Sequence, residues 1–269
     1  MTRAADTSQQ TTEDVLARAI AAIGQPEFVL RALDYLGCAM DYQGCLLTRL
    51  DGKRPPVHVY DDVRAERRAE VVDRYLDGAY MLDPFYVAYA ETRPCNALRL
   101  RDVAPDRFQQ SSYYHTYYSA IRLRDEAAIF VDLPSGHHLF YSVGRVEEKP
   151  RFSQKDMERA RRILPVFAAI NRRHFSVERP APAGTPDPAI AQQDIETAMA
   201  RFGAEELTDR ERQIAILILK GHSSKSIADR IGVSPGTVKI HRRNFYRKLN
   251  ISAQSELFSM FLASLTRAA

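Results

Sequence analysis

The stretch SPGTVKIHRRNFYRKL, residues 234–249, gathers basic side chains that could bind an anion. Such a run of charge can face solvent, a membrane surface, or the phosphates and bases of a nucleic acid. The chain has 38 Lys and Arg and 34 Asp and Glu. Residues 205–269 hold 11 of these basic residues and 6 of the acidic ones. All the net positive charge therefore lies in this last part, which predicts a polyanionic partner for it. The basic residues of the stretch are Lys239, Arg242, Arg243, Arg247 and Lys248.

The residues around the start of this stretch have the spacing of two helices joined by a tight turn. Ala228 is followed four residues later by Gly232 and six further by Val238. A small residue permits close helix packing, glycine accepts a left-handed backbone in the turn, and Val238 would fill the angle between the helices. Ser234 can cap the second helix, with Pro235 at its first position. The pattern predicts a helix-turn-helix.

On a helical wheel of about 100° per residue, the second helix has one apolar face and one basic face. A basic face with a single apolar residue suits the major groove of DNA, which presents guanine acceptors and thymine methyl groups. A membrane surface is disfavoured because polar residues interrupt any wide apolar face. Val238, Phe245 and Leu249 share the first face, and the second carries Lys239, Ile240, Arg243 and Arg247.

Residues 207–257, LTDRERQIAILILKGHSSKSIADRIGVSPGTVKIHRRNFYRKLNISAQSEL, resemble the DNA-binding domain of LuxR-family (GerE-type) bacterial regulators. The resemblance implies a transcription regulator that binds a palindromic operator as a homodimer, with RNA polymerase as a candidate partner. It implies that the last helix, residues 255–265, supplies part of the contact between two DNA-binding domains. By the same resemblance Lys239, Ile240 and Arg243 would read base edges, and Ser224, Lys225, Thr237 and Arg247 would hold phosphates.

A proline-rich stretch, VERPAPAGTPDPAIAQQ, divides the chain and predicts a domain boundary near residues 177–189. Residues 1–176 would form a ligand-sensing or dimerisation domain, and residues 177–204 a linker with a connecting helix. Residues 205–269 would form the DNA-binding domain, in which every segment has a helical pattern. The amphipathic helix from Ser153 to Phe175 is the natural dimer element of the first domain.

Helical and strand patterns alternate before the linker and predict an α/β sandwich, a central and mostly antiparallel sheet flanked by helices. The second domain would be an all-α, four-helix helix-turn-helix domain. Pro26 suits the first position of one helix, and Pro165 predicts a kink or break near residues 161–165 of another. Helices are expected at 12–23, 26–40 and 153–175, and strands at 44–50, 55–61, 126–133 and 137–144, the last two joined as a hairpin.

Residues 74–89, RYLDGAYMLDPFYVAY, resemble the segment of autoinducer-binding domains in which spaced aromatic residues precede an Asp-Pro pair. By that resemblance Asp83 would accept a hydrogen bond from a ligand amide; it could equally cap a helix that starts at Pro84. The chain has no tryptophan, so the residue that donates to the lactone carbonyl in this family is missing, and its place falls near Val71. The sequence therefore argues against an acyl-homoserine lactone and favours a different small organic ligand or none.

The stretch SSYYHTYYSAIRL adds further tyrosines, which suit either a pocket wall or the core. The residues predicted to bind the ligand are Tyr75, Tyr80, Asp83, Tyr86, Tyr114 and Tyr118.

Other functional classes lack their sequence signals. A phosphoreceiver would need a switch hydroxyl between Ser119 and Ser135, and none occurs there. Nucleophile elbows, phosphate loops, metal-ligand spacings and dinucleotide fingerprints are also missing, so neither an enzyme, a metal site nor a cofactor is predicted. Three cysteines without redox spacing and no long apolar run predict a cytoplasmic protein without membrane contact. The first domain could instead serve only for dimerisation or protein contact.

Overall fold

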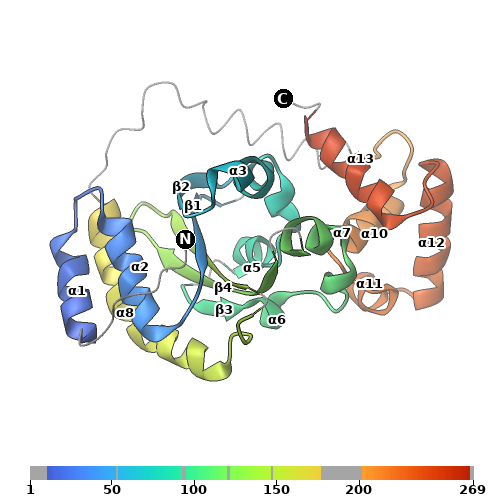
Figure 1. Cartoon of the computed structure of the whole chain (residues 1–269). Helices are drawn as coiled ribbons and strands as arrows, with labels where there is room; N and C mark the ends of the chain where they lie inside the picture. The colour runs from blue at the N-terminus through green and yellow to red at the C-terminus, as the bar shows by residue number, and fades with distance from the viewer. Residues whose placement is uncertain are drawn as a thin grey trace.

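The computed structural model describes residues 11–52, 54–92, 95–119, 122–146, 148–176 and 202–266. Figure 1 shows a sheet covered by helices on both faces, followed by a group of helices formed by the C-terminal part of the chain. The expected α/β sandwich and all-α helical domain are both confirmed. The predicted linker at residues 177–189, and most of the connecting helix expected after it, lie outside the described residues.

The sheet has five strands in the order β2-β1-β5-β4-β3, and every neighbouring pair is antiparallel. The predicted hairpin is confirmed as β4 and β5, and Gly136 in its turn has a φ of 83°, which glycine adopts without strain. The short β3 was not expected from the sequence. The strands are β1 (Gly44–Leu50), β2 (Val57–Asp61), β3 (Ala97–Arg99), β4 (Leu123–Asp132) and β5 (His138–Val146).

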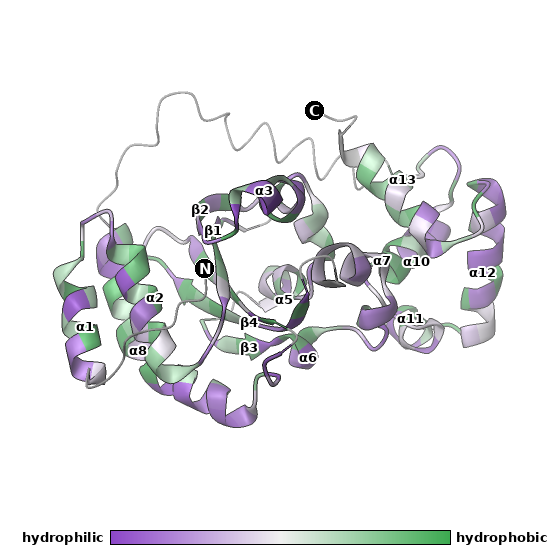
Figure 2. Ribbon diagram, viewed as in Figure 1, coloured by the Kyte–Doolittle hydropathy of each residue, from purple (hydrophilic) through white to green (hydrophobic). Residues whose placement is uncertain are grey.

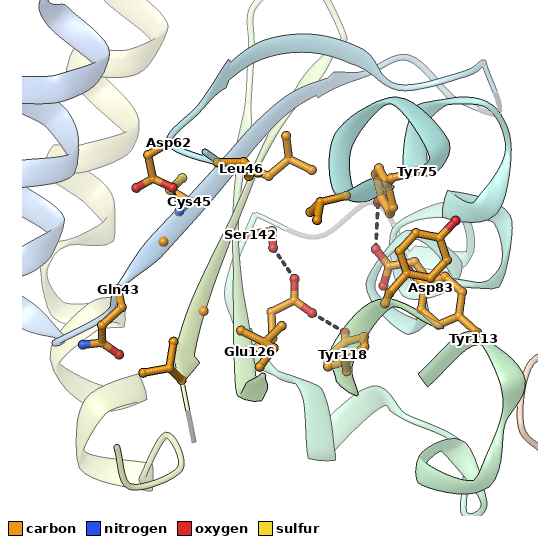
Figure 3. A pocket seen from close by; sticks show the side chains of 17 residues that line it. Gln43, Cys45, Leu46, Asp62, Tyr75, Asp83, Tyr113, Tyr118, Glu126 and Ser142 are labelled. Atoms are coloured by element: carbon orange, nitrogen blue, oxygen red, sulfur yellow. Dashed lines mark hydrogen bonds between the residues drawn. The ribbon is translucent and has the colours of Figure 1, made fainter. Parts of the chain in front are cut away.

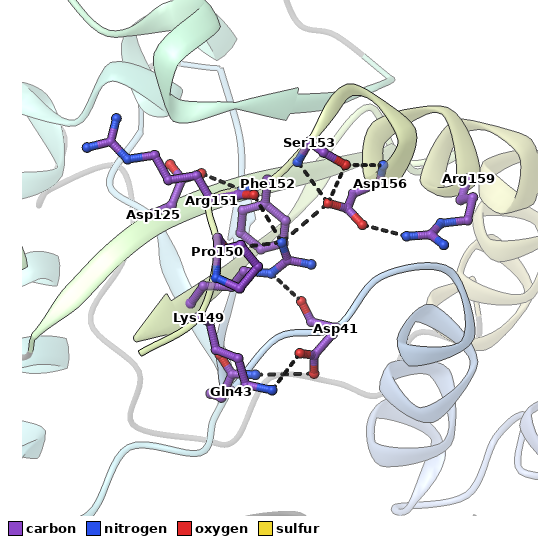
Figure 4. A network of polar contacts seen from close by, with 11 residues as sticks. Asp41, Gln43, Asp125, Lys149, Pro150, Arg151, Phe152, Ser153, Asp156 and Arg159 are labelled. Carbon is purple, nitrogen blue, oxygen red and sulfur yellow. Dashed lines mark hydrogen bonds and ion pairs between the residues drawn. The ribbon is translucent and has the colours of Figure 1, made fainter. Parts of the chain in front are cut away.

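Three long helices cover one face of the sheet: α1 (Thr12–Ala21), α2 (Phe28–Ala39) and α8 (Gln154–Phe175). Their apolar faces pack on Leu47, Ile129 and Tyr141. Arg145 of β5 ties the start of α8 to the sheet, since its guanidinium donates to the backbone oxygen of Asp41 at 2.8 Å and pairs with Asp156 at 3.3 Å (Figure 4).

The expected place of Pro26 was wrong, and the break expected at Pro165 does not occur. Helix α2 starts at Phe28 with Glu27 as its N-cap, so Pro26 lies before the first helical position. Helix α8 runs for 22 residues through Pro165 without a break. Proline removes one backbone hydrogen bond, but the burial of Phe167, Ala168 and neighbouring residues against the sheet holds the following turns in place.

Short helices cover the opposite face and bring a layer of aromatic side chains onto it (Figure 1). The rings of Phe130 and Phe140 stack at 4.9 Å in the sheet, and Tyr89 stacks on Phe130 at 6.0 Å. The elements are α3 (Ala65–Arg68), η1 (Ala69–Asp73), α4 (Arg74–Leu76), η2 (Ala79–Leu82), α5 (Pro84–Thr92), α6 (Leu100–Val103), η3 (Phe108–Gln110), α7 (Ser112–Tyr114) and η4 (His115–Ser119).

The C-terminal domain consists of α10 (Asp209–Leu219), α11 (Ser224–Ile231), α12 (Pro235–Lys248) and α13 (Gln254–Thr266). Gly232 ends α11 in the left-handed region with a φ of 68°, and the Ser234 hydroxyl caps α12, as the turn pattern predicted. Lys248 pairs with the buried carboxylate of Glu211 at 2.7 Å, which joins α12 to α10. Figure 2 shows hydrophobic residues concentrated in the central strands, whereas α12 is largely hydrophilic.

Candidate functional site

Helix α12 presents the two faces that the helical wheel predicts. Val238 and Phe245 are fully buried against the other helices of the domain, while Ile240 is 52% exposed. Lys239 and Arg243 are exposed beside Ile240. An exposed isoleucine between two cations has no packing role within the described chain, and it matches the mixture of acceptors and methyl groups in a major groove.

The residues predicted to hold phosphates lie mostly at two helix N-termini. Ser224 is the first residue of α11 and is half-buried, and Lys225 next to it is exposed. Thr237 lies in the first turn of α12, where its backbone N–H donates to the Ser234 hydroxyl at 3.0 Å. Helix N-termini favour anions because their N–H groups and dipoles point outward. Arg247 is exposed at the other end of α12.

A cavity of about 240 Å³ lies in the first domain between the sheet and the short helices (Figure 3). It brings together three of the six residues predicted to bind a ligand: Tyr75, Asp83 and Tyr118. Val71 also lines it, so the position at which the family tryptophan is missing falls in the cavity wall.

The other three predicted residues do not line this cavity. Tyr80 and Tyr86 are buried in the core beside it, where their rings meet edge to face at 4.7 Å. Tyr114 stacks on the outer side of Tyr118 at 5.2 Å. These three tyrosines lie near the cavity, as the sequence predicted. Their rings pack against neighbouring aromatic side chains and do not line the cavity.

Asp83 caps a helix, and its side chain also lines the cavity in which a ligand contact was predicted. One carboxylate oxygen accepts the hydroxyl of Tyr75 at 2.7 Å, and the other accepts the backbone N–H of Phe85 at 2.8 Å, in the first turn of α5. Burial raises the pKa of Asp83 to about 6, although the hydrogen bonds from Tyr75 and the backbone oppose the rise. Asp83 therefore caps a helix and also lies in the cavity wall.

Sequence reasoning missed Glu126, a second buried carboxylate in the cavity. It accepts hydrogen bonds from the hydroxyls of Tyr118 and Ser142 (Figure 3). The available signal was its place in the strand, because Glu126 lies two and four residues before the buried Ala128 and Phe130 and therefore shares their face of β4. Tyr113 and Tyr117 also line the cavity and belong to the tyrosine-rich stretch.

The DNA-binding domain contacts the first domain close to the cavity. The backbone N–H of Arg107 donates to the carbonyl of Gly221 at 3.0 Å. The backbone N–H of Ser223, the N-cap of α11, donates to the Asp106 carboxylate at 2.9 Å. A polar gap of about 360 Å³ separates the domains beside these bonds, with Glu91 and Lys220 among its lining residues. The two domains are therefore joined by hydrogen bonds between defined atoms, but the gap beside these bonds leaves their interface incompletely packed.

The hydrogen bonds of Asp106 and Arg107 with Ser223 and Gly221 form the docking contact between the domains. Aromatic side chains connect this docking contact with the cavity. The ring of Phe108 lies 5.4 Å from that of Tyr118, which bonds Glu126. A Cβ at Gly221 would lie 2.8 Å from the Cα of Phe108, so the two backbones touch. A shift of Tyr118 would consequently change the surface on which α10 and α11 rest.

No cluster of metal-ligating side chains occurs among the described residues. None of the helices in the described ranges is long and apolar enough to cross a membrane.

Comparisons with known proteins agree with both parts of this arrangement. The family model of LuxR-family bacterial regulatory proteins (GerE) matches residues 205–261. The HTH-type transcriptional regulator in the exeN 3' region of Aeromonas salmonicida is 31% identical over 189 residues, which cover 69% of this chain and 96% of that protein. Transcriptional regulatory protein UhpA of Salmonella typhimurium is 42% identical over 64 residues, which cover 24% of this chain and only 33% of UhpA.

The first domain resembles the solved LBD domain of VqsR from Pseudomonas aeruginosa. The two share 22% identity with a TM-score of 0.55, over 62% of this chain and 98% of that one. This likeness supports the fold of the domain. The family match and the identity to the Aeromonas regulator over nearly its whole length confirm the resemblance found in the sequence: the chain belongs to the LuxR family of bacterial regulatory proteins and is a DNA-binding transcriptional regulator.

Proposed function

We propose that this regulator senses a small organic molecule in the cavity of its first domain and thereby adjusts its affinity for a palindromic operator. Lys239, Ile240 and Arg243 read the bases, and Ser224, Lys225, Thr237 and Arg247 hold the phosphates. The observation that carries the sensor role is the cavity itself, which is lined mainly by apolar and aromatic side chains with a few buried polar groups. Sites for small molecules have this composition.

The docking contact supplies a route from the cavity to DNA. The Asp106 carboxylate lies at the N-terminus of α11, next to Ser224 and Lys225. A DNA phosphate placed there would compete with Asp106 for the same N–H groups and would be repelled by its charge. The docked arrangement therefore weakens DNA binding. A ligand that moves Tyr118 and Phe108 alters the docking surface and changes the proportion of docked domains.

Removing the Asp106 carboxylate should strengthen DNA binding. For Asp106→Ala we expect the affinity of the full chain for duplex DNA to rise about twofold to tenfold at low salt, the equivalent of one hydrogen bond and one repulsive charge. Fluorescence anisotropy against a labelled duplex measures the change. Asp34→Ala makes the same change of charge on α2, away from the docking contact, and should leave the affinity within twofold. If Asp34→Ala raised the DNA affinity as much as Asp106→Ala, the role of Asp106 in the docking contact would be contradicted.

Native mass spectrometry of the full chain purified from its own cells tests the sensor role. We expect a bound small molecule in the wild-type protein. Asp83→Ala should lose the bound molecule, because this change opens the cavity wall and removes a hydrogen-bond acceptor for the ligand. Asp83→Asn keeps the shape and the cap, so it distinguishes loss of the ligand from loss of the fold, which circular dichroism monitors. An empty cavity in folded wild-type protein, together with a stable dimer, would favour a module for dimerisation or protein contact.

The homodimer belongs to the same proposal. Residues 255–265 lie on α13, whose Leu257, Phe258 and Phe261 are buried within the chain, so the outer side of this helix remains for a second copy. The apolar face of α8 packs on its own sheet, which leaves its charged face for contacts with a partner. Contact with RNA polymerase would follow operator binding.

A further inference from the structure

The floor of the cavity contains two glycines beside a glutamate. Gly44 of β1 lies opposite Gly144 of β5, and Gly144 lies opposite Glu126 of β4, so the three residues form one row across the sheet. Residues that face each other in antiparallel strands share one side of the sheet. Because two members of the row have no side chain, a neighbouring side chain enters the floor: a Cβ at Gly144 would lie 2.5 Å from Cδ1 of Leu123, which lines the cavity together with Glu126.

Glu126 occupies a position where a core residue is expected. It is only 8% exposed, and the next two residues on its face, Ala128 and Phe130, are fully buried. Its carboxylate accepts two hydroxyl groups but forms no ion pair with any Lys, Arg or His in the described ranges. A buried ionised carboxylate without a cation is costly. The protein nevertheless keeps an acidic side chain at this buried position, and burial raises its pKa so that protonation avoids this cost while no cation is present.

Every charged side chain that lines the cavity is acidic: Asp62, Asp83 and Glu126. The remaining walls are aliphatic or aromatic, apart from the hydroxyls, the Cys45 thiol and Gln43. A ligand with a carboxylate or phosphate would meet like charges in a medium of low dielectric constant. A neutral ligand would leave Glu126 protonated and without a cationic partner. A ligand with one cationic group on an apolar body would pair with the acidic side chains and would pack against the apolar walls.

Near neutral pH Glu126 is protonated when the cavity is empty. Burial, and then the charge of Asp83, raise the pKa of Glu126 to about 8, with a further contribution from Asp125 and against the hydrogen bonds from Ser142 and Tyr118. A cation placed beside the carboxylate would reverse this shift. The proton of Glu126 would leave for solvent when such a ligand binds.

We propose that the cavity binds an amine with an apolar body, whose ammonium group donates hydrogen bonds to the carboxylates of Glu126 and Asp83. The proposal rests on the proposed sensor function and adds the chemical class of the ligand. Binding places a positive charge between acidic groups whose mutual repulsion otherwise favours protonation of Glu126. The apolar body lies against Leu46, Val71 and Leu123.

Matched probes test the class of ligand. n-Octylamine and 2-phenylethylamine, each with its alcohol and its carboxylate counterpart, are titrated into the full chain by calorimetry and by thermal shift. We expect the amines to bind at least tenfold more tightly than the alcohols, and the carboxylates more weakly than either. Glu126→Gln should lose this preference for amines. Glu158→Gln makes the same change at an exposed position of α8 and should retain it.

Proton release gives a second readout that non-specific amine binding would not produce. With a Glu126 pKa near 8, calorimetry at pH 7 in two buffers of different ionisation enthalpy should detect release of protons, approaching one per amine bound. The apparent affinity should fall about tenfold between pH 7 and pH 6, because Glu126 must lose its proton before pairing. Neither effect should remain in Glu126→Gln.

The outcomes separate this proposal from the sensor function. Tighter binding of the alcohols than of the amines, or a cellular occupant without a basic nitrogen in native mass spectrometry, would overturn the amine class and leave the sensor function standing. If no probe binds and the protein from cells is empty, both are overturned. A cellular occupant with a basic nitrogen, lost in Glu126→Gln but retained in Glu158→Gln, supports both.

Discussion

Arg243→Ala should lose specific operator affinity by about 1 to 3 kcal/mol, or roughly 5- to 150-fold, and should tolerate a changed base pair at the position that Arg243 reads. The guanidinium is exposed next to Ile240 on the outer face of α12, where a bidentate contact with guanine is the commonest specific arrangement. Operator sequences selected from a random duplex library provide the DNA, and anisotropy titrations against single-base variants measure discrimination.

Arg242 supplies a matched control on the same helix. Its side chain turns to Tyr246, with the guanidinium carbon 5.1 Å from the ring centroid and a hydrogen bond to the hydroxyl at 3.3 Å. Arg242→Ala removes the same charge and should weaken all sequences alike. If Arg243→Ala also weakened all sequences alike and kept full discrimination, its assignment to base reading would be wrong.

Glu126→Gln should become more stable relative to the wild-type protein as pH rises from 5 to 8. In the unfolded chain Glu126 ionises around its ordinary pKa of 4.5, whereas burial raises its folded pKa to about 8. Between these values the folded state holds a proton that the unfolded state has lost, so the wild-type protein loses stability with rising pH. Glutamine has no such proton. We expect the difference in unfolding free energy between the two proteins to change by about 3 kcal/mol across this range.

Urea unfolding of both proteins at pH 5, 6, 7 and 8, without added ligand, measures this difference. The comparison cancels the groups that titrate independently of Glu126, including His222, whose pKa burial lowers to about 4, whereas Asp83 titrates together with Glu126. A constant difference between the two proteins would mean that Glu126 titrates normally in the folded state. A difference that favours the wild-type protein at high pH would show that Glu126 is already paired with a cation.

The sequence predicted elements well where local chemistry decides their position. Strand β1 begins and ends where its apolar pattern does, and the turn at Gly232 and the cap at Ser234 depend on residues with few alternatives. The break expected at Pro165 and the expected place of Pro26 at the start of a helix were wrong. Contacts with the sheet hold α8 together through Pro165, and the chain before Phe28 turns instead of extending α2 backward through Pro26.

The cavity could be predicted only in part, because it forms between elements distant in sequence. Asp83 and Tyr118 were found from the types of residue around them. Glu126 was missed because the pattern of one strand does not reveal its neighbours across the sheet, here Gly144 and Gly44, or that the short helices leave a cavity above it. The docking contact at Asp106 joins residues 117 positions apart and has no sequence signal.

The most direct test of ligand control is the operator affinity of one protein sample with the cavity filled and emptied. The full chain from its own cells is titrated with operator DNA before and after its small molecules are removed, and again after they are returned, with native mass spectrometry recording occupancy. We predict a reversible change of at least fivefold, the range of ordinary allosteric coupling. Equal affinity in the filled and emptied states would contradict ligand control of DNA binding.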